Sequence, residues 1–192
     1  MCVSRCLQCV AVSLVPLAIV CMLSNILLLL PELKIDFLLE GHVTREATWA
    51  TGLWGSGFLV REHTHTRFLM SCYSSDEQQG VFLSSVCLLA AGFCCLVSAT
   101  GLSQGPLCFY NTTSGCTWGV PLYPGYLYNR TLWSGVCLKP RGVVQWNVIL
   151  FGVMVGASGL QTVLCGANVF NSLLGLILGP ECHDSKYQKL FF

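Results

Sequence analysis

Three long uncharged runs separate the polar parts of this chain. They cover residues 10–30, 81–103 and 143–170, which are 21, 23 and 28 residues long. A helix rises about 1.5 Å per residue and the hydrocarbon core of a bilayer is about 30 Å thick, so each run is long enough to span a membrane. Backbone groups in lipid must find hydrogen-bond partners within their own segment, which predicts helices rather than strands.

A fourth candidate span, residues 47–60, is shorter. Its 14 apolar or small residues would make about 21 Å of helix, about 9 Å less than the bilayer core. Arg61, Glu62 and Arg67 follow it, and each charge would cost about 2.5–3.5 kcal/mol at the centre of a membrane. Helix tilt, local thinning of the bilayer or snorkelling of the arginines would let the segment cross. We therefore predict a shortened second span.

The composition is that of an integral membrane protein. Hydrophobic residues make up 54% of the chain and charged residues 10%, whereas soluble domains contain about 25% charged residues. The net charge of +1 gives no electrostatic reason to expect a nucleic-acid partner. The first run is too long for the apolar part of a signal peptide and no A-x-A-like site follows it, so we interpret it as a retained span.

The loop between the third and fourth spans has features of an extracellular or lumenal segment. It contains glycosylation sequons at Asn111 and Asn129, neither with a central proline, and the cysteines Cys108, Cys116 and Cys137. With four spans and a cytoplasmic N-terminus, the lysines and arginines divide five against five between the two sides, so the positive-inside rule does not decide the orientation. A cytosolic loop with unused sequons is the alternative.

The remaining cysteines fall into two groups. Those next to the predicted spans on the cytoplasmic side are candidates for S-palmitoylation: Cys2, Cys6, Cys9, Cys72 and Cys182. Those inside spans are interpreted as small apolar packing residues: Cys21, Cys87, Cys94, Cys95 and Cys165. Zinc binding near the N-terminus lacks a matching second cysteine pair. His63 and His65 would share a face only on a strand, and nothing else completes a coordination shell, so we predict neither a metal site nor another cofactor.

Small and polar residues in the spans predict helix contacts. A G-x-x-x-G pattern lies in the fourth span, extended by one further glycine: Gly152, Gly156 and Gly159. A similar stripe in the third span contains Ala90, Cys94 and Ser98. We interpret both as packing inside the bundle, and a contact with a second copy or a partner protein is the alternative. Three polar residues are interpreted as interhelical hydrogen-bonding groups: Asn25, Gln161 and Asn168.

The sequence contains no pattern of a catalytic site. A nucleophile elbow, a phosphate loop and a histidine near an obvious nucleophile are all absent. The three long spans contain no carboxylate, lysine or histidine, which argues against a transporter or pump. In the C-terminal tail, Tyr187 and Leu190 match a tyrosine-based sorting signal, which adaptors bind as an extended strand. Leu190 and Phe192 alternatively form a C-terminal PDZ ligand.

Several segments together resemble a known family: MCVSRCLQC, SNILLLLPE, GLWGSG, SATGLSQGPLC, YLYNRTLWSGVCLKP, VVQWNVILF and VFNSLLGL. Through them nearly the whole chain resembles the transmembrane 4 L six family of tetraspanin-like surface proteins. True tetraspanins carry Cys-Cys-Gly in the large outer loop, whereas Cys94-Cys95 lies inside the third span here. Claudins carry their Trp and Cys signature in the first outer loop, whereas the loop cysteines here lie in the second.

The resemblance has consequences for four features. It implies a disulfide between Cys108 and Cys137, and closing this loop of 28 intervening residues would stabilise the fold by about 3–4 kcal/mol. Cys116 is then odd, and could pair with another chain, stay free or displace one partner. Glycosylation is implied at Asn129, whereas Asn111 is supported only by its sequon. Family members continue the second span for about another half-helix beyond Val60, where this chain reads REHTHTR. Splicing or a gene-model error would explain the difference, and a plain juxtamembrane loop is the alternative.

We therefore predict an all-α membrane protein, a four-transmembrane-helix bundle with both ends cytoplasmic, a shortened second span and a small disulfide-bonded extracellular loop. The predicted boundaries are a cytoplasmic N-terminus at 1–9, spans at 10–30, 47–60, 81–103 and 143–170, outer loops at 31–46 and 104–142, a cytoplasmic loop at 61–80 and a cytoplasmic tail at 171–192.

The resemblance implies a non-enzymatic organiser at the plasma membrane, with endosomal or lysosomal membranes as alternatives. Its expected partners are membrane lipids, receptors such as integrins, tetraspanins and a second copy of itself, through which it would modulate adhesion, migration or growth signalling. The alternatives are an accessory subunit of a channel or transporter and a trafficking adaptor that uses Tyr187.

The sorting signal can be tested directly. If Tyr187 anchors the tail to an adaptor, Tyr187→Ala should raise the amount of chain at the cell surface about twofold or more, because a lost anchor side chain weakens strand-type peptide binding. Surface biotinylation of the full chain measures this, with Tyr128→Ala, in the predicted outer loop, as the control. An unchanged surface level in Tyr187→Ala would exclude the signal.

Overall fold

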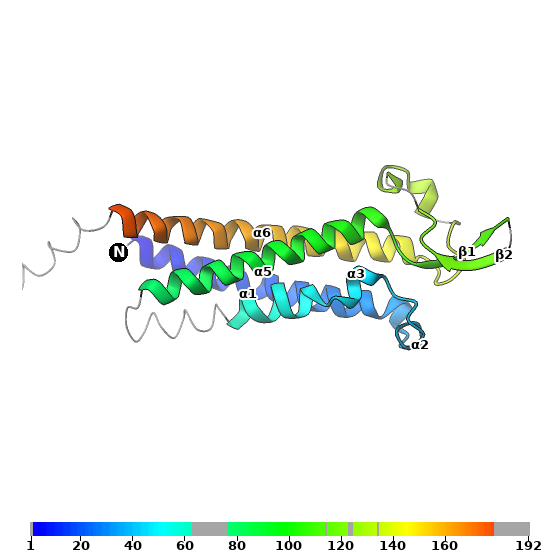
Figure 1. Ribbon diagram of the computed structural model, residues 1–192, viewed down its shortest axis with the longest axis horizontal. Coiled ribbons are helices and arrows are strands. Elements are labelled where there is room, and N and C mark those ends of the chain that lie inside the picture. Colours follow the sequence, from blue (N-terminus) through cyan, green and yellow to red (C-terminus); the bar gives the residue numbers. More distant parts are fainter. Residues whose placement is uncertain (1, 63–76, 114, 123–124, 134, 179–192) are drawn as a thin grey trace, which may run out of the picture.

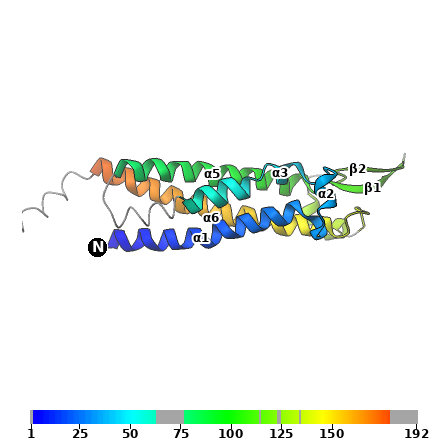
Figure 2. The same cartoon turned by 90° about the horizontal axis from the view of Figure 1, so that it is seen from below.

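Three long helices form the body of the molecule (Figure 1). The computed structural model describes residues 2–62, 77–113, 115–122, 125–133 and 135–178. The long helices are α1 (Cys2–Leu29), α5 (Glu77–Gln104) and α6 (Val143–Leu178). They lie side by side, with the start of α1 and the end of α6 at one end of the molecule and a β-hairpin at the other (Figure 2).

Two helices in the described part of the chain are long and apolar enough to cross a membrane. These segments are Ser84–Gln104 of α5 and Val143–Leu174 of α6, and α1 adds a shorter apolar segment at Ser13–Leu29. Large apolar side chains on their outward faces are exposed, including Leu89 (73%), Leu96 (68%) and Val163 (67%). Such a surface suits lipid rather than water.

The predicted second span is not one regular helix. It consists of α3 (Arg45–Thr48), an interruption at Ala50 with a positive φ of 52°, and the π-helix η2 (Gly52–Leu59), which continues as α-helix to Glu62. The segment predicted as a shortened span at 47–60 is therefore helical on both sides of an interruption at Ala50, and whether it spans a membrane stays a prediction. A non-glycine residue at positive φ breaks the helical ladder, and glycines nearby lower the helix propensity of the segment.

Glycine allows η2 to approach its neighbours on several sides. A Cβ atom at Gly52 would lie 2.8 Å from the carbonyl oxygen of Cys21 in α1 and 2.8 Å from Met154 Cε in α6. At Gly57 a Cβ would lie 2.2 Å from Met22 Cγ. Close packing therefore requires glycine at both positions. The contacts that this close approach allows offset the low helix propensity of glycine.

Buried polar groups join the second segment to the long helices. The Ser56 hydroxyl donates to Gln161 Oε1 in α6 and lies 3.3 Å from Cys21 Sγ in α1, and Gln161 Nε2 donates to the Ser56 carbonyl at 3.3 Å. Ser56 and Gln161 are both 0% exposed. Asn25 Nδ2 of α1 donates to the Ala47 carbonyl of α3 at 3.4 Å. Because lipid offers no hydrogen-bond partner, these bonds favour the packed arrangement.

The two small-residue stripes face in different directions. Ala90, Cys94 and Ser98 of α5 are buried, so their interpretation as packing residues agrees with the structure. Gly152 and Gly156 of α6 are exposed, and a Cβ on either would meet nothing within 4 Å. Their interpretation as packing residues inside this chain is therefore wrong, since they lie on the same outward face as the exposed Val163.

Gly159 lies closer to the interior than the other two glycines of its pattern. A Cβ there would lie 3.8 Å from Cys95 Sγ in α5, an ordinary van der Waals contact. Among the predicted polar helix contacts, Asn25 and Gln161 make hydrogen bonds between elements. Asn168 is buried, and its hydrogen bonding stays a prediction.

The end of the molecule opposite the N-terminus contains short elements rather than a purely helical loop. Between α1 and α3 lie η1 (Pro31–Leu33) and α2 (Asp36–Leu39). After α5 come the antiparallel strands β1 (Cys108–Thr112) and β2 (Gly115–Gly119), followed by the 3-10 turns η3 (Tyr126–Tyr128) and η4 (Arg130–Trp133). The pairing places Cys108 opposite Gly119 and Asn111 opposite Cys116. The chain is thus mostly helical but not all-α.

The Ser56–Gln161 contact should contribute measurably to stability. We expect the double-mutant cycle of Ser56→Ala and Gln161→Met to give a coupling of about 1 kcal/mol, because either change removes the hydrogen bond between the Ser56 hydroxyl and Gln161 Oε1 from an apolar interior. Unfolding of the purified chain in detergent measures the free energies. Ser103→Ala, which removes an exposed hydroxyl that bonds within its own helix, is the control. Additive losses would contradict the contact.

Candidate functional site

A disulfide fixes the outer loop to its own base. Cys108 at the start of β1 and Cys137 are joined, with their Cα atoms 5.6 Å apart, and this is the pair that the family resemblance implies. Cys108 is fully buried in a small cluster with Leu122, Tyr126 and Val144. The backbone of Phe109 also pairs with Lys139, through hydrogen bonds to Lys139 and Leu138. The covalent bond therefore reinforces an anchored strand.

Tyr126 connects the outer loop to the end of α5. Its hydroxyl donates to the Leu102 carbonyl at 2.6 Å, and its own carbonyl accepts from Trp133 Nε1 at 3.0 Å. The Arg130 guanidinium lies over the Trp133 ring, 5.8 Å from the centroid. These contacts explain physically why a tyrosine and a tryptophan occur seven residues apart in YLYNRTLW.

Burial affects the chemistry of this tyrosine. Because Tyr126 is 2% exposed, desolvation raises the pKa of its phenol from 10.0 to about 12. The neutral form is therefore favoured in the folded chain, and its contribution to stability is complete below pH 10 and is lost as the pH rises toward 12. Tyr126 is a structural residue at neutral pH, not an acid or base.

The first outer loop meets the hairpin through aromatic rings. His42 stacks on Trp118 of β2 with centroids 3.8 Å apart and planes 5° from parallel. Phe37 and Phe109 contact the same indole at 6.4 and 5.6 Å. His42 Nδ1 also lies 3.1 Å from Glu40 Oε2. Segments that are distant in sequence thus form one aromatic cluster above the helices.

The first loop is also tied to the start of α6. Glu32 Oε1 accepts from the backbone nitrogen of Arg141 at 2.7 Å, and Trp146 Nε1 of α6 donates to the Leu27 carbonyl of α1 at 3.0 Å. Glu32 has a positive φ of 57°, which is uncommon for a non-glycine residue. SNILLLLPE and VVQWNVILF, two of the segments that carry the family resemblance, therefore meet directly.

A family model described as "L6 membrane protein" matches residues 1–182. The chain belongs to this family. It is 32% identical to human transmembrane 4 L6 family member 1 over 209 aligned positions, covering 97% of this chain and 99% of the relative. It is 34% identical to rat member 4, covering 93% of each. No solved structure matches the chain. The protein is therefore a tetraspanin-like transmembrane protein.

The alignments also show that one relative contains residues that this chain lacks. The match with human member 1 extends over 209 positions although this chain has 192 residues, so that relative contains residues without a counterpart here. Human member 19 is 36% identical over 171 positions, covering 80% of this chain and 82% of the relative. The TGLWGSG segment and the end of the fourth span predict a likeness to that member, and this identity confirms it.

The two sequons of this L6 family chain lie in different settings. Asn129 is exposed after η3, and its Oδ1 accepts from Thr131 Oγ1 at 2.5 Å and from Thr131 N at 3.2 Å. This turn leaves Asn129 Nδ2 free for a glycan. Asn111 is exposed on β1, where its Oδ1 lies 3.8 Å from Cys116 Sγ. Accessibility therefore permits both sites, and glycosylation of each stays a prediction.

The structure locates only some of the predicted modification sites. Cys116 is exposed and forms no disulfide within the described residues. Cys2, Cys6 and Cys9 lie in the first turns of α1, which begins earlier than the predicted span. The other palmitoylation candidates, Cys72 and Cys182, lie outside the described residues. The tail signal of Tyr187 and Leu190 also lies outside them, as do His63 and His65 of REHTHTR. Their roles stay predictions.

Neither a catalytic set nor a metal centre emerges from the residues that the structure describes. Within them, no group of three histidine, cysteine, aspartate or glutamate side chains could hold a metal ion. Sequence reasoning missed His42, Trp118 and Ser56, which connect separate elements. Trp118 could not be recognised from the sequence as a contact between loops, because its stacking partner His42 is 76 residues away in sequence.

The Tyr126 contact makes a specific prediction. Tyr126→Phe removes the donor to the Leu102 carbonyl and should lower the free energy of unfolding by about 1 kcal/mol. It should also remove a tyrosine that ionises near pH 12 from an alkaline spectrophotometric titration. Tyr128→Phe, at a side chain that is 95% exposed, should change neither quantity. Equal stability of wild type and Tyr126→Phe would contradict the role of the bond.

Proposed function

We propose that this L6 family chain is a non-enzymatic organiser that associates laterally with other membrane proteins, integrin-type receptors among them, and so modulates adhesion, migration or growth signalling. The supporting observation is the outward notch at Gly152 and Gly156. A Cβ at either position would meet no atom of the described residues within 4 Å, whereas the neighbouring outward residues Ile149, Leu160 and Val163 are bulky and 50–67% exposed.

The notch is suited to a second helix. Small residues four apart let two helix backbones approach closely, so that dispersion contacts replace those with lipid. The bulky residues around it would supply complementary ridges. The partner can be a receptor helix or α6 of a second copy, and in either case a side chain in the notch would prevent close approach.

A four-span topology is part of the proposal. Two apolar helices, α5 and α6, can cross by length, and α1 lies beside them (Figure 1). The helical part of the second segment from Thr51 to Glu62 would extend about 18 Å at α-helical rise, and less as a π-helix. Its buried contacts with α1 and α6 favour insertion next to them despite this short length.

The outer loop would contribute contacts above the membrane. The aromatic cluster and the disulfide hold the hairpin in a fixed position relative to the first loop, so a receptor ectodomain would meet a preorganised surface. Acyl chains on membrane-apposed cysteines would concentrate the protein in lipid domains, because each buried methylene contributes about 0.8 kcal/mol.

Filling the notch tests the proposal. The double substitution Gly152→Leu and Gly156→Leu should lower recovery of integrin subunits with the tagged chain in a mild detergent about fivefold or more, since it removes close helix approach. The substitution should not unfold the chain, because nothing lies within 4 Å of either added Cβ.

Leu96→Phe is the control. It adds bulk to the outward face of α5, away from the notch, at a residue that is already large and 68% exposed, so recovery should equal that of wild type. Unchanged recovery with the filled notch would reject lateral association through α6.

A further inference from the structure

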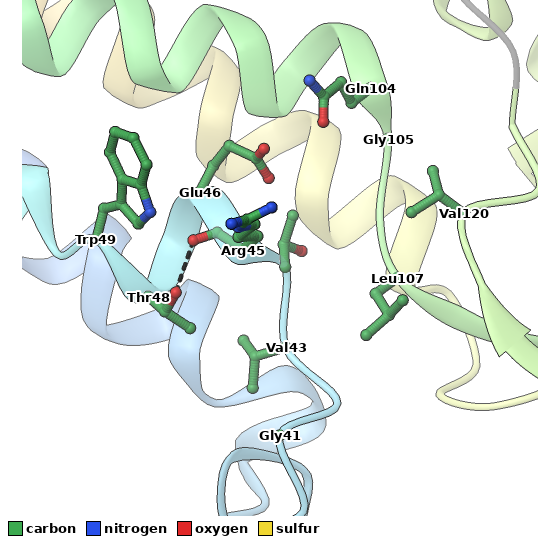
Figure 3. A pocket seen from close by; sticks show the side chains of 11 residues that line it. Gly41, Val43, Arg45, Glu46, Thr48, Trp49, Gln104, Gly105, Leu107 and Val120 are labelled. Carbon is green, nitrogen blue, oxygen red and sulfur yellow. Dashed lines mark hydrogen bonds between the residues drawn. The ribbon is translucent and has the colours of Figure 1, made fainter.

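A pocket of about 760 Å³ opens between the first loop and the end of α5 (Figure 3). One side is formed by the turn around α3, with Arg45, Glu46 and Trp49, and the other by Gln104 at the end of α5. Leu107 and Val120, which flank the hairpin, close it from above the helices. In Figure 3, the side chains of Glu46 and Gln104 extend into the space between α3 and α5. The pocket therefore combines charged, amide and apolar walls.

The pocket lies at the end of a segment that is long and apolar enough to cross a membrane. Gln104 lines the pocket and is the last residue of this segment, Ser84–Gln104. Trp49 and Trp54 are 53% and 47% exposed, and their rings lie 6.2 and 6.3 Å from that of Phe93 on α5. Exposed tryptophans gather at membrane interfaces, where an apolar ring meets the headgroups. The rings of Trp49, Trp54 and Phe93 thus mark the membrane-facing edge of the pocket.

The charges of the pocket are available to a ligand. Within the described residues, neither Arg45 nor Glu46 forms an ion pair with a partner side chain, whereas Lys34 of the same loop pairs with Glu32. One cation and one anion thus stand on adjacent residues of α3. A ligand that complements both must itself carry an anion and a cation a short distance apart.

We propose that this pocket binds the phosphocholine headgroup of a phospholipid in the adjacent leaflet. The Arg45 guanidinium and the Gln104 amide nitrogen donate hydrogen bonds to the phosphate oxygens. The quaternary ammonium lies by the Glu46 carboxylate and the Trp49 ring, since aromatic faces attract such cations. The acyl chains lie along the exposed apolar side chains Trp54, Phe58 and Phe93.

A buried amide near the pocket supports a polar occupant in this region. A smaller cavity of about 10 Å³ shares Val43, Thr44 and Leu107 with the large pocket and reaches Asn147 of α6. Asn147 is 2% exposed, and neither its Nδ2 nor its Oδ1 has a hydrogen-bond partner among the described residues. A cavity of this size accepts one water molecule, which would connect Asn147 to the wall of the headgroup pocket.

Native mass spectrometry of the full chain, delipidated in detergent, tests the site. Palmitoyl-oleoyl phosphatidylcholine should bind about tenfold more tightly than phosphatidylglycerol of the same chains, because the second lipid lacks the cation for Glu46 and Trp49. Arg45→Gln should weaken binding of phosphatidylcholine about tenfold. Glu46→Gln and Trp49→Leu should each weaken it about threefold.

Matched controls separate the site from general charge effects. Lys34→Gln and Asp36→Asn change the same charges on the same loop at exposed residues outside the pocket, so both should bind phosphatidylcholine as the wild type does. Equal affinity for the two lipids, or unchanged binding in both Arg45→Gln and Glu46→Gln, would overturn the proposal. Free phosphocholine that competes at the same concentration as the lipid would assign the pocket to a soluble ligand instead.

Discussion

The architecture depends on a buried polar contact at the centre of the bundle, between Ser56 and Gln161. The segment that contains Ser56 is short and interrupted at Ala50, and charged residues follow it. The transfer of its apolar side chains into lipid therefore contributes little free energy to its insertion in a membrane. Two hydrogen bonds to α6, the contact with Cys21 and the close approach at Gly52 and Gly57 supply specific partners. A shortened span can remain part of the bundle because its neighbours satisfy its polar groups.

The outer part of the molecule follows from how these helices end. α5 leads into a strand that the Cys108–Cys137 disulfide joins to the segment before α6. Tyr126, His42 and Trp118 then connect this loop to α5 and to the first loop. These contacts join the two outer loops, and the pocket with charged, amide and apolar walls lies where they meet the end of α5. The notch at Gly152 and Gly156 lies on the outward face of α6. The lipid recognition proposed at the pocket and the helix docking proposed at the notch involve different surfaces, so a substitution at one should leave the other unchanged.

Periodicity and length predicted the long helices, because a membrane imposes a simple requirement on apolar runs. The disulfide pair came from the family resemblance, since the spacing of three cysteines alone left the pairing open. The interruption at Ala50 could not be predicted, because a positive φ at an alanine has no sequence pattern that announces it. The outward direction of Gly152 and Gly156 was misjudged for a different reason. A G-x-x-x-G pattern identifies a face of a helix but not the neighbour that the face meets.

The central question is whether the second segment crosses the membrane. Two observations together answer it: whether Asn129 carries a glycan, and on which side of the membrane the N-terminus lies. The chain is expressed with an N-terminal tag, the tag is located by protease protection in intact microsomes, and a glycosidase shift is compared with that of Asn129→Gln. Four crossings predict a cytoplasmic tag and a glycan that Asn129→Gln removes. A cytoplasmic tag with no glycan on either sequon, or a lumenal tag with a glycan at Asn129, would contradict a crossing by the second segment.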